Sequence, residues 1–209
     1  QLSAGPLGSA RRLVSQVDLA SDFTIRPSTV EGTEGLWACV DAIARERRYL
    51  AMVEAPSLEQ VRAFLGAMPS CAIHLVVLAG SQVIGWCDLT PKLLKGFRHS
   101  ATLGMGLLPA YRGRGLGRAL LRSVLRQAEL HHLSRIELEV YTSNEPAIAL
   151  YERFGFAREG VKRSARVLDG QAEDILCMAL LSPPHGRGAA KQERSRGHAR
   201  RRSGSVHHL

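Results

Sequence analysis

The sequence predicts an α/β domain in which a mixed, mostly antiparallel sheet is flanked by helices. In some segments apolar residues recur every three or four positions, as Leu116, Leu120 and Val124 do, which is the spacing of one helix face. In others, apolar and polar residues alternate, as from Ile136 to Val140, which is the period of a strand. Helical and strand segments are intermingled along the chain, and this order favours one layered α/β domain.

Local signals predict where the individual elements begin and end. Ser57, with Gln60 three residues later, is expected to cap the second helix, and Asn144 is expected to cap the last one. In chain order, the expected elements are a strand at 23–26, helices opening at Thr33 and after Ser57, strands at 72–79, 83–89 and 101–108, a helix at 116–130, a strand at 136–140, a helix at 144–154, and two closing strands joined by an Asp169-Gly170 turn, the second at 175–181.

The two ends of the chain differ in composition from the middle. Residues 182–209 hold seven Lys and Arg residues, one Glu and almost no large apolar side chains, so we expect a disordered basic tail there. Residues 1–21 are expected to form a flexible N-terminal extension, which leaves 22–181 as the folded domain. Most of the net charge of +9 therefore lies in the tail. Such a tail permits contact with nucleic acid or an anionic membrane, but a solvated extension without a specific partner is the favoured interpretation.

Composition also narrows the class of protein. No segment approaches the roughly 20 apolar residues that a membrane span needs, and the first thirty residues lack the order of a secretory signal. A cytoplasmic protein without a membrane partner is therefore expected. The four cysteines form no C-x-x-C pair, so buried free thiols and no metal site are expected. They are Cys39, Cys71, Cys87 and Cys177.

A glycine-rich loop joins the predicted strand 101–108 to the predicted helix 116–130. Its sequence is Tyr-Arg-Gly-Arg-Gly-Leu-Gly-Arg, from Tyr111 to Arg118. The N-terminus of a helix presents unpaired N–H groups and the positive end of the helix dipole, and glycines let an anion approach the backbone. The loop therefore predicts a phosphate or pyrophosphate site. Its glycine spacing does not fit the dinucleotide fingerprint, and it lacks the Gly-Lys followed by Ser or Thr that a P-loop needs.

The pattern Arg-x-x-Gly-x-Gly, at Arg112, Gly115 and Gly117, resembles the acetyl-CoA motif of the GNAT superfamily of N-acetyltransferases. The stretch from Asn144 to Phe156 resembles the N-x-x-A-x-x-L-Y-x-x-x-G-F motif of the same family. The closing strands resemble those of bacterial amino-acid (phosphinothricin-type) and ribosomal-protein-alanine N-acetyltransferases. The resemblance covers 101–180 and implies the GNAT fold, with acetyl-CoA as cosubstrate.

The resemblance also implies which residues hold coenzyme A. The loop residues would cradle the pyrophosphate, and Asn144 would anchor coenzyme A or act only as a helix cap. The pantetheine arm would pair with a bulged strand at Met105, Gly106 and Leu107, and the Leu107 N–H would face the thioester oxygen. Glycine inside a strand, here Gly104 and Gly106, indicates a bulge or the close approach of another group. The loop residues are Arg112, Gly113, Arg114, Gly115, Leu116, Gly117 and Arg118.

Two residues match the family's catalytic positions. Tyr151 matches the general acid that protonates the departing thiolate, although a tyrosine packed on a helix face would look the same. Glu139 matches a general base, with a solvent-facing strand carboxylate as the alternative, and Glu137 lies on the same strand face. Asp88 and His99 are lesser candidates for the base.

The expected function is transfer of acetyl from acetyl-CoA to a primary amine of a small molecule such as an amino acid. The alternatives are acetylation of peptide or protein N-termini, and a non-catalytic acyl-CoA-binding module. Nucleic-acid binding through the tail is not favoured, because the folded part lacks interleaved aromatic and basic residues. A monomer or a homodimer is expected.

Overall fold

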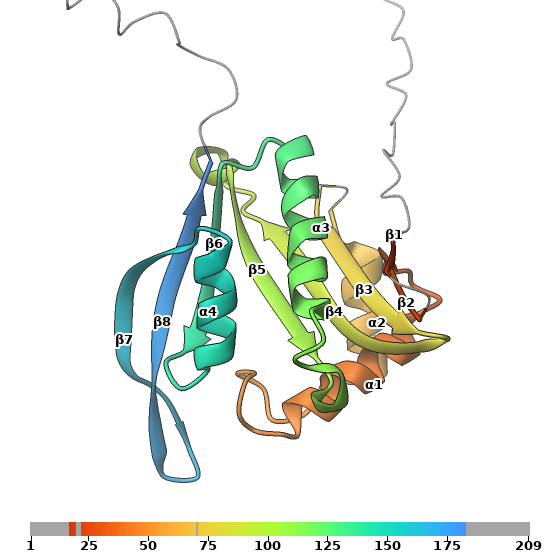
Figure 1. Cartoon of the computed structure of the whole chain (residues 1–209), viewed down its shortest axis with the longest axis horizontal. Helices are drawn as coiled ribbons and strands as arrows, with labels where there is room; N and C mark the ends of the chain where they lie inside the picture. Colours follow the sequence, from red (N-terminus) through yellow and green to blue (C-terminus); the bar gives the residue numbers. More distant parts are fainter. Residues whose placement is uncertain (1–16, 20–21, 70, 183–209) are drawn as a thin grey trace, which may run out of the picture.

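The computed structural model describes residues 17–19, 22–69 and 71–182, which form a sheet with helices on both faces (Figure 1). The helices are α1 (Thr33–Ala44), α2 (Leu58–Ala67), α3 (Leu116–Leu130) and α4 (Glu145–Arg153), with short 3-10 turns η1 (Lys95–Phe97) and η2 (Pro109–Tyr111). The strands are β1 (Val17–Leu19), β2 (Phe23–Pro27), β3 (Ile73–Ala79), β4 (Gln82–Pro91), β5 (Ser100–Leu107), β6 (Arg135–Tyr141), β7 (Ala157–Leu168) and β8 (Gln171–Leu181).

The eight strands lie in the order β1-β2-β3-β4-β5-β6-β8-β7. Every neighbouring pair is antiparallel except β5 and β6, which are parallel and are connected through α3. The predicted mixed, mostly antiparallel sheet is therefore confirmed. The parallel pair is also short, since only Ser100–Thr102 of β5 pair with Arg135–Glu137 of β6.

Each face of the sheet has its own hydrophobic cluster. On one face α3 and α4 bury Leu120, Leu121 and Val124 against the inward residues of the central strands. This is the apolar stripe that the helical spacing predicted. On the other face α1 and α2 pack against Trp86 and the neighbouring residues of β3 and β4. Helices α1 and α2 cover that face near β3 and β4, so the same face of β6 carries half-exposed and exposed side chains such as Glu137 and Glu139.

The predicted order of elements from 23 to 181 is confirmed, with boundaries shifted by a few residues. One expectation was wrong: residues 17–19, placed in a flexible extension, form strand β1 and pair with β2. The basic tail lies outside the described residues, apart from Ser182, and the limits of the folded domain stay a prediction. All four cysteines are free, but only Cys39 and Cys87 are buried, whereas Cys71 and Cys177 are half-buried.

The glycines of β5 mark close contacts and not a bulge. The β4–β5 register runs without a shift from Gly85↔Leu107 to Pro91↔Ala101, so the expected bulge in β5 was wrong. A Cβ on Gly106 would come within 2.5 Å of the Trp86 ring, and one on Gly104 would come within 2.8 Å of Asp88 Oδ1. Large side chains of β4 thus lie over the β5 backbone, which leaves room only for glycine.

Candidate functional site

Strands β5 and β6 separate after their short parallel contact. Pairing ends at Thr102 and Glu137, yet β5 continues to Leu107 and β6 to Tyr141. No other described strand pairs with the β6-facing edge of β5 beyond Thr102. A strand edge of this kind presents backbone donors and acceptors to any extended ligand.

The direction of these backbone groups follows from the ladder on the other side of β5. The Leu108 N–H donates to the Ile84 carbonyl at 2.9 Å. Because residues of an antiparallel strand alternate between bonding to the partner and pointing away from it, Met105 and Leu107 direct their N–H and C=O groups away from β4, towards the gap. The Leu107 carbonyl is occupied by Arg112 Nε at 2.9 Å, whereas its N–H remains available.

The glycine loop lies at the same end of β5, where η2 leads into α3 (Figure 1). Gly113 and Gly115 have φ angles of 75° and 79°, a left-handed conformation that favours glycine. A Cβ on either residue would meet no atom within 4 Å, so the space above the loop is open. Among the described residues, no acceptor is bonded to the N–H groups of 113–118. The loop therefore offers a concentrated set of donors for an anion.

Gly117 shows that the loop, β5 and α4 meet at one place. A Cβ on Gly117 would lie 3.4 Å from Leu150 of α4 and 3.5 Å from both Leu107 and Met105 of β5. The half-buried Leu107 and Met105 side chains pack on the α3 and α4 side of the sheet. The sequence-predicted residues of β5 and the loop are thus brought together.

The three arginines of the loop differ in their surroundings. The Arg112 guanidinium is bound by Glu46, with Nη1–Oε2 and Nη2–Oε1 distances of 2.7 and 2.5 Å, and it stacks on Tyr49. It therefore holds the loop to the end of α1, and its expected role as a phosphate ligand is not supported for the side chain. Arg114 and Arg118 are exposed and make no ion pair with other described residues, so both are available to an anionic ligand.

Helix α4 supplies Asn144 and Tyr151. The Asn144 side chain accepts a hydrogen bond from the Ala147 N–H at 3.4 Å, which confirms the predicted cap. Tyr151 is buried and packs on Phe156, with ring centroids 5.7 Å apart. Burial, with a smaller effect of the nearby Cys87 thiol, raises the pKa of Tyr151, so its hydroxyl stays protonated at neutral pH.

The Tyr151 hydroxyl also keeps contact with solvent. It makes no hydrogen bond to the described residues. Among the described residues, His74 Nδ1 is the one side-chain nitrogen or oxygen that is sealed from solvent and has no hydrogen-bond partner. Tyr151 Oη is therefore not fully sealed from solvent, which a proton donor to a bound ligand requires.

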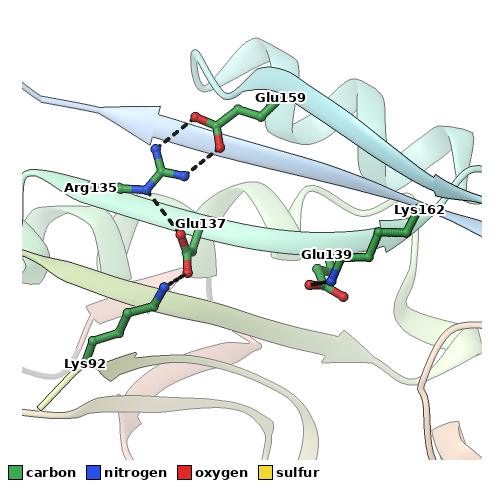
Figure 2. Close-up of polar contacts among 6 residues, drawn as sticks. All are labelled: Lys92, Arg135, Glu137, Glu139, Glu159 and Lys162. Carbon is green, nitrogen blue, oxygen red and sulfur yellow. Dashed lines mark hydrogen bonds and ion pairs between the residues drawn. The ribbon is translucent and has the colours of Figure 1, made fainter. Parts of the chain in front are cut away.

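The two glutamates of β6 have cationic partners (Figure 2). Glu139 is exposed and paired with Lys162 of β7. Glu137 lies between Lys92 and Arg135, which lower the pKa of its carboxyl mainly through the hydrogen bond from Lys92. Arg135 also binds Glu159 through both carboxylate oxygens. The predicted base Glu139 thus lies on the open face beside the gap, but its charge is compensated.

The surroundings of Asp88 make it a stronger candidate for the base than its sequence context indicated. It is half-buried, and its carboxylate forms no ion pair with another described residue. Burial raises its pKa to about 6. The sequence signal available was Gly104 alone, because a glycine inside a strand indicates that another group lies above it. His99 is exposed at the start of β5, at the opposite end of the strand from Leu107.

A separate cavity of about 260 Å³ lies at the other end of α3. It is lined mainly by apolar side chains of α3, β6 and β8, with Glu129 as its charged group. It contains none of the predicted site residues. The described residues contain no cluster of metal-ligating side chains, and none of their helices is long and apolar enough to cross a bilayer.

A parted pair of parallel strands beside a helix N-terminus with free N–H groups is an arrangement that suits an extended, phosphate-bearing ligand. The chain belongs to the acetyltransferase (GNAT) family, whose sequence profile matches residues 36–156. This confirms the resemblance noted from the two motifs.

Individual relatives match shorter stretches. The [ribosomal protein bS18]-alanine N-acetyltransferase of Escherichia coli K12 is 40% identical over 72 residues, which cover 34% of this chain and 49% of the relative. The L-amino acid N-acetyltransferase AaaT of the same strain is 28% identical over 109 residues, which cover 52% of this chain and 67% of AaaT. The chain thus spans about half the length of the first of these curated relatives.

Solved structures support the fold. YncA of Salmonella typhimurium, a putative acetyltransferase determined with its cofactor acetyl-CoA, superimposes with a TM-score of 0.73 at 20% identity. The superposition covers 81% of this chain and 99% of YncA. The predicted GNAT fold is therefore confirmed.

Proposed function

We propose that the protein transfers acetyl from acetyl-CoA to a primary amine of a small molecule such as an amino acid. The observation that supports this most strongly is the free β5 edge at Met105 and Leu107, which lies beside the unpaired N–H groups of 113–118. An acyl-pantetheine arm can pair along such an edge while its pyrophosphate binds the helix N-terminus. The name of AaaT, an L-amino acid N-acetyltransferase, agrees with this acceptor class, and the YncA structure, determined with acetyl-CoA, agrees with the cosubstrate.

The chemistry follows from the proposed pose. The amine nitrogen attacks the thioester carbon, a C–N bond forms, and the carbonyl oxygen gains negative charge next to the Leu107 N–H. The C–S bond then breaks, and the thiolate takes a proton from Tyr151. The amine must lose a proton on the opposite side of the reacting carbon, and the nitrogen keeps the acetyl group. Transfer is direct, without an acyl-enzyme.

A peptide or protein N-terminus is the second candidate acceptor. Its support is the printed activity of the bS18-alanine N-acetyltransferase, which matches over 72 residues. The open face of β6 offers space for either kind of acceptor, because its charged side chains are half-exposed or exposed. An acceptor panel is therefore the decisive measurement.

The first prediction concerns the glycine loop. Gly115→Glu places a carboxylate where the pyrophosphate would bind and forces a side chain into φ 79°, so acetyl-CoA affinity should fall at least about a hundredfold by calorimetry. Gly66→Glu, at an open position of α2, is the matched control and should bind normally. Unchanged affinity in Gly115→Glu would refute the proposed site.

Turnover is measured as thiol release from acetyl-CoA with single L-amino acids and with an alanine-initiated peptide. Release with an amino acid supports the first acceptor class, and release with the peptide alone supports the second. Tight acetyl-CoA binding without release on any amine would favour a non-catalytic acyl-CoA-binding module.

A further inference from the structure

Three strands place one row of residues on the α1 and α2 face of the sheet, and the row leads to the edge of β5. His74 of β3 is directly opposite Asp88 of β4, and Asp88 is directly opposite Gly104 of β5. Cross-strand partners point to the same face of a sheet. The Asp88 carboxylate therefore lies over the backbone of Gly104, where a Cβ would be 2.8 Å from Oδ1. The row ends at the edge of β5 from which β6 has parted.

Asp88 and Tyr151 lie on opposite faces of the sheet. Trp86, two residues before Asp88, packs with α1 and α2, whereas Tyr151 packs in the cluster of α3 and α4. The proposed thiolate leaves on the Tyr151 side, so the amine approaches from the Asp88 side. The group that takes the proton from the amine must therefore lie on the Asp88 side of the sheet.

The charges around Asp88 leave its carboxylate uncompensated. Its carboxylate accepts a weak hydrogen bond from the Thr90 hydroxyl, at 3.4 Å, and a hydrogen bond from the Trp86 side chain, and it forms no ion pair with another described residue. Burial lowers the pKa of the facing His74 to about 4, so that imidazole is neutral at pH 7 and supplies no positive charge. On β6, Glu137 is already bound by Lys92 and Arg135. Asp88 is thus the acidic group of this face that retains an unpaired charge for an incoming ammonium ion.

We propose that Asp88 binds the acceptor ammonium and takes its proton, directly or through one water molecule, before the amine attacks the thioester. This inference rests on the proposed function and deepens it: the acceptor is an amine that arrives as a cation. One N–H bond of the ammonium breaks, one O–H bond forms on Asp88, and the proton passes to solvent after product release. Glu139 is the less suitable base, because it is exposed and paired with Lys162.

The activity test compares four proteins on the best acceptor of the panel. Asp88→Asn should lower kcat/KM about a hundredfold while acetyl-CoA affinity stays within about twofold. It should also abolish the acidic limb of the kcat/KM profile, which in the wild type lies near pH 6. Asp22→Asn, an exposed change of the same kind, is the matched control. Glu139→Gln is the rival, and a larger loss in that variant than in Asp88→Asn would overturn the proposal.

Thermal melting provides a readout without an acceptor. Burial of the ionised Asp88 destabilises the fold, so Asp88→Asn should melt at a higher temperature than the wild type at pH 8. The difference should shrink as the pH falls from 6 towards 4, because the folded wild type becomes protonated. A lower melting temperature at pH 8 would make Asp88 a structural residue and refute the proposal.

The two proposals fail in different ways. If the wild type acetylates an amine and Asp88→Asn keeps both its rate and its acidic limb, the assignment of Asp88 is wrong and the proposed function stands. If the wild type acetylates no amine, the proposed function fails and the assignment fails with it.

Discussion

At the scale of single residues, Tyr151 shows how burial and chemistry coincide. Its ring fills the core beneath α4, and the same burial raises the pKa of the hydroxyl. The raised pKa keeps the phenol protonated at neutral pH, as a proton donor must be, but it also makes the phenol a weaker acid than a thiol, whose ordinary pKa is about 8.5. The side chain proposed as the acid is thus also a packing residue of the core.

Tyr151→Phe separates the two roles, because it removes the hydroxyl and keeps the ring. If Tyr151 is the acid, kcat should fall at least about tenfold, with little change in acetyl-CoA affinity or melting temperature. Pre-steady-state thiol release measures the chemical step directly. Tyr111→Phe, which loses only a 3.4 Å contact to Gln82, is the control. An unchanged chemical step in Tyr151→Phe would identify Tyr151 as a packing residue.

At the scale of elements, the segment after α1 connects both sides of the site. Glu46 binds Arg112, which in turn holds the Leu107 carbonyl at the end of β5. The next residue, Arg47, forms a bidentate pair with Asp169 at the tip of the β7–β8 hairpin. That pair is exposed and contributes little to stability. The Glu46–Arg112 pair is more enclosed and fixes the strand edge on which the proposed chemistry depends.

Arg112→Met tests this connection. It leaves the half-buried Glu46 and the Leu107 carbonyl without a donor, so the free energy of unfolding should fall by about 2 kcal/mol in urea titration. Arg122→Met, on the exposed side of α3, should change it by less than about 0.5 kcal/mol. Equal effects of the two changes would show that the pair does not fix the loop.

At the scale of the whole molecule, two neighbouring groups on β3 and β4 give stability opposite dependences on pH. His74 has a folded pKa of about 4 against an ordinary value of 6.5, so its contribution is lost as the pH falls between these values. Asp88 has a folded pKa of about 6 against 3.8, so its contribution is gained over nearly the same fall. In the wild type, these two pH dependences of the free energy of unfolding should largely cancel.

Replacing one of the two residues should reveal the pH dependence of stability that the other one causes. Asp88→Asn should lose about 3 kcal/mol of unfolding free energy between pH 6.5 and 4, and His74→Leu should gain about 3 kcal/mol between pH 6 and 4. Urea titrations across this range measure both. Below about pH 4 every variant should lose stability, because the hydrogen bonds from Lys92 and Arg135 lower the pKa values of Glu137 and Glu159. Parallel curves for the wild type and both variants would contradict this account.

The sequence by itself determined the order of elements, because hydrophobic periodicity and caps are local properties. The Ser57–Gln60 capping box and the Asn144 cap were both readable from residue type and spacing. The same local signals predicted an anion site at the glycine loop. Strand β1 was missed, because three residues carry too little pattern to be recognised without the neighbour with which they pair.

Only the tertiary structure decided which charged side chains lack an ion-pair partner and are available to a ligand. Arg112 and Arg114 look alike in the loop, yet Glu46, 66 residues away in the chain, engages the first and not the second. Glu139 and Asp88 both looked like strand carboxylates, but Lys162 pairs with one, and burial raises the pKa of the other. The availability of a charged side chain depends on desolvation and on partners brought near by folding, and neither is a property of local sequence.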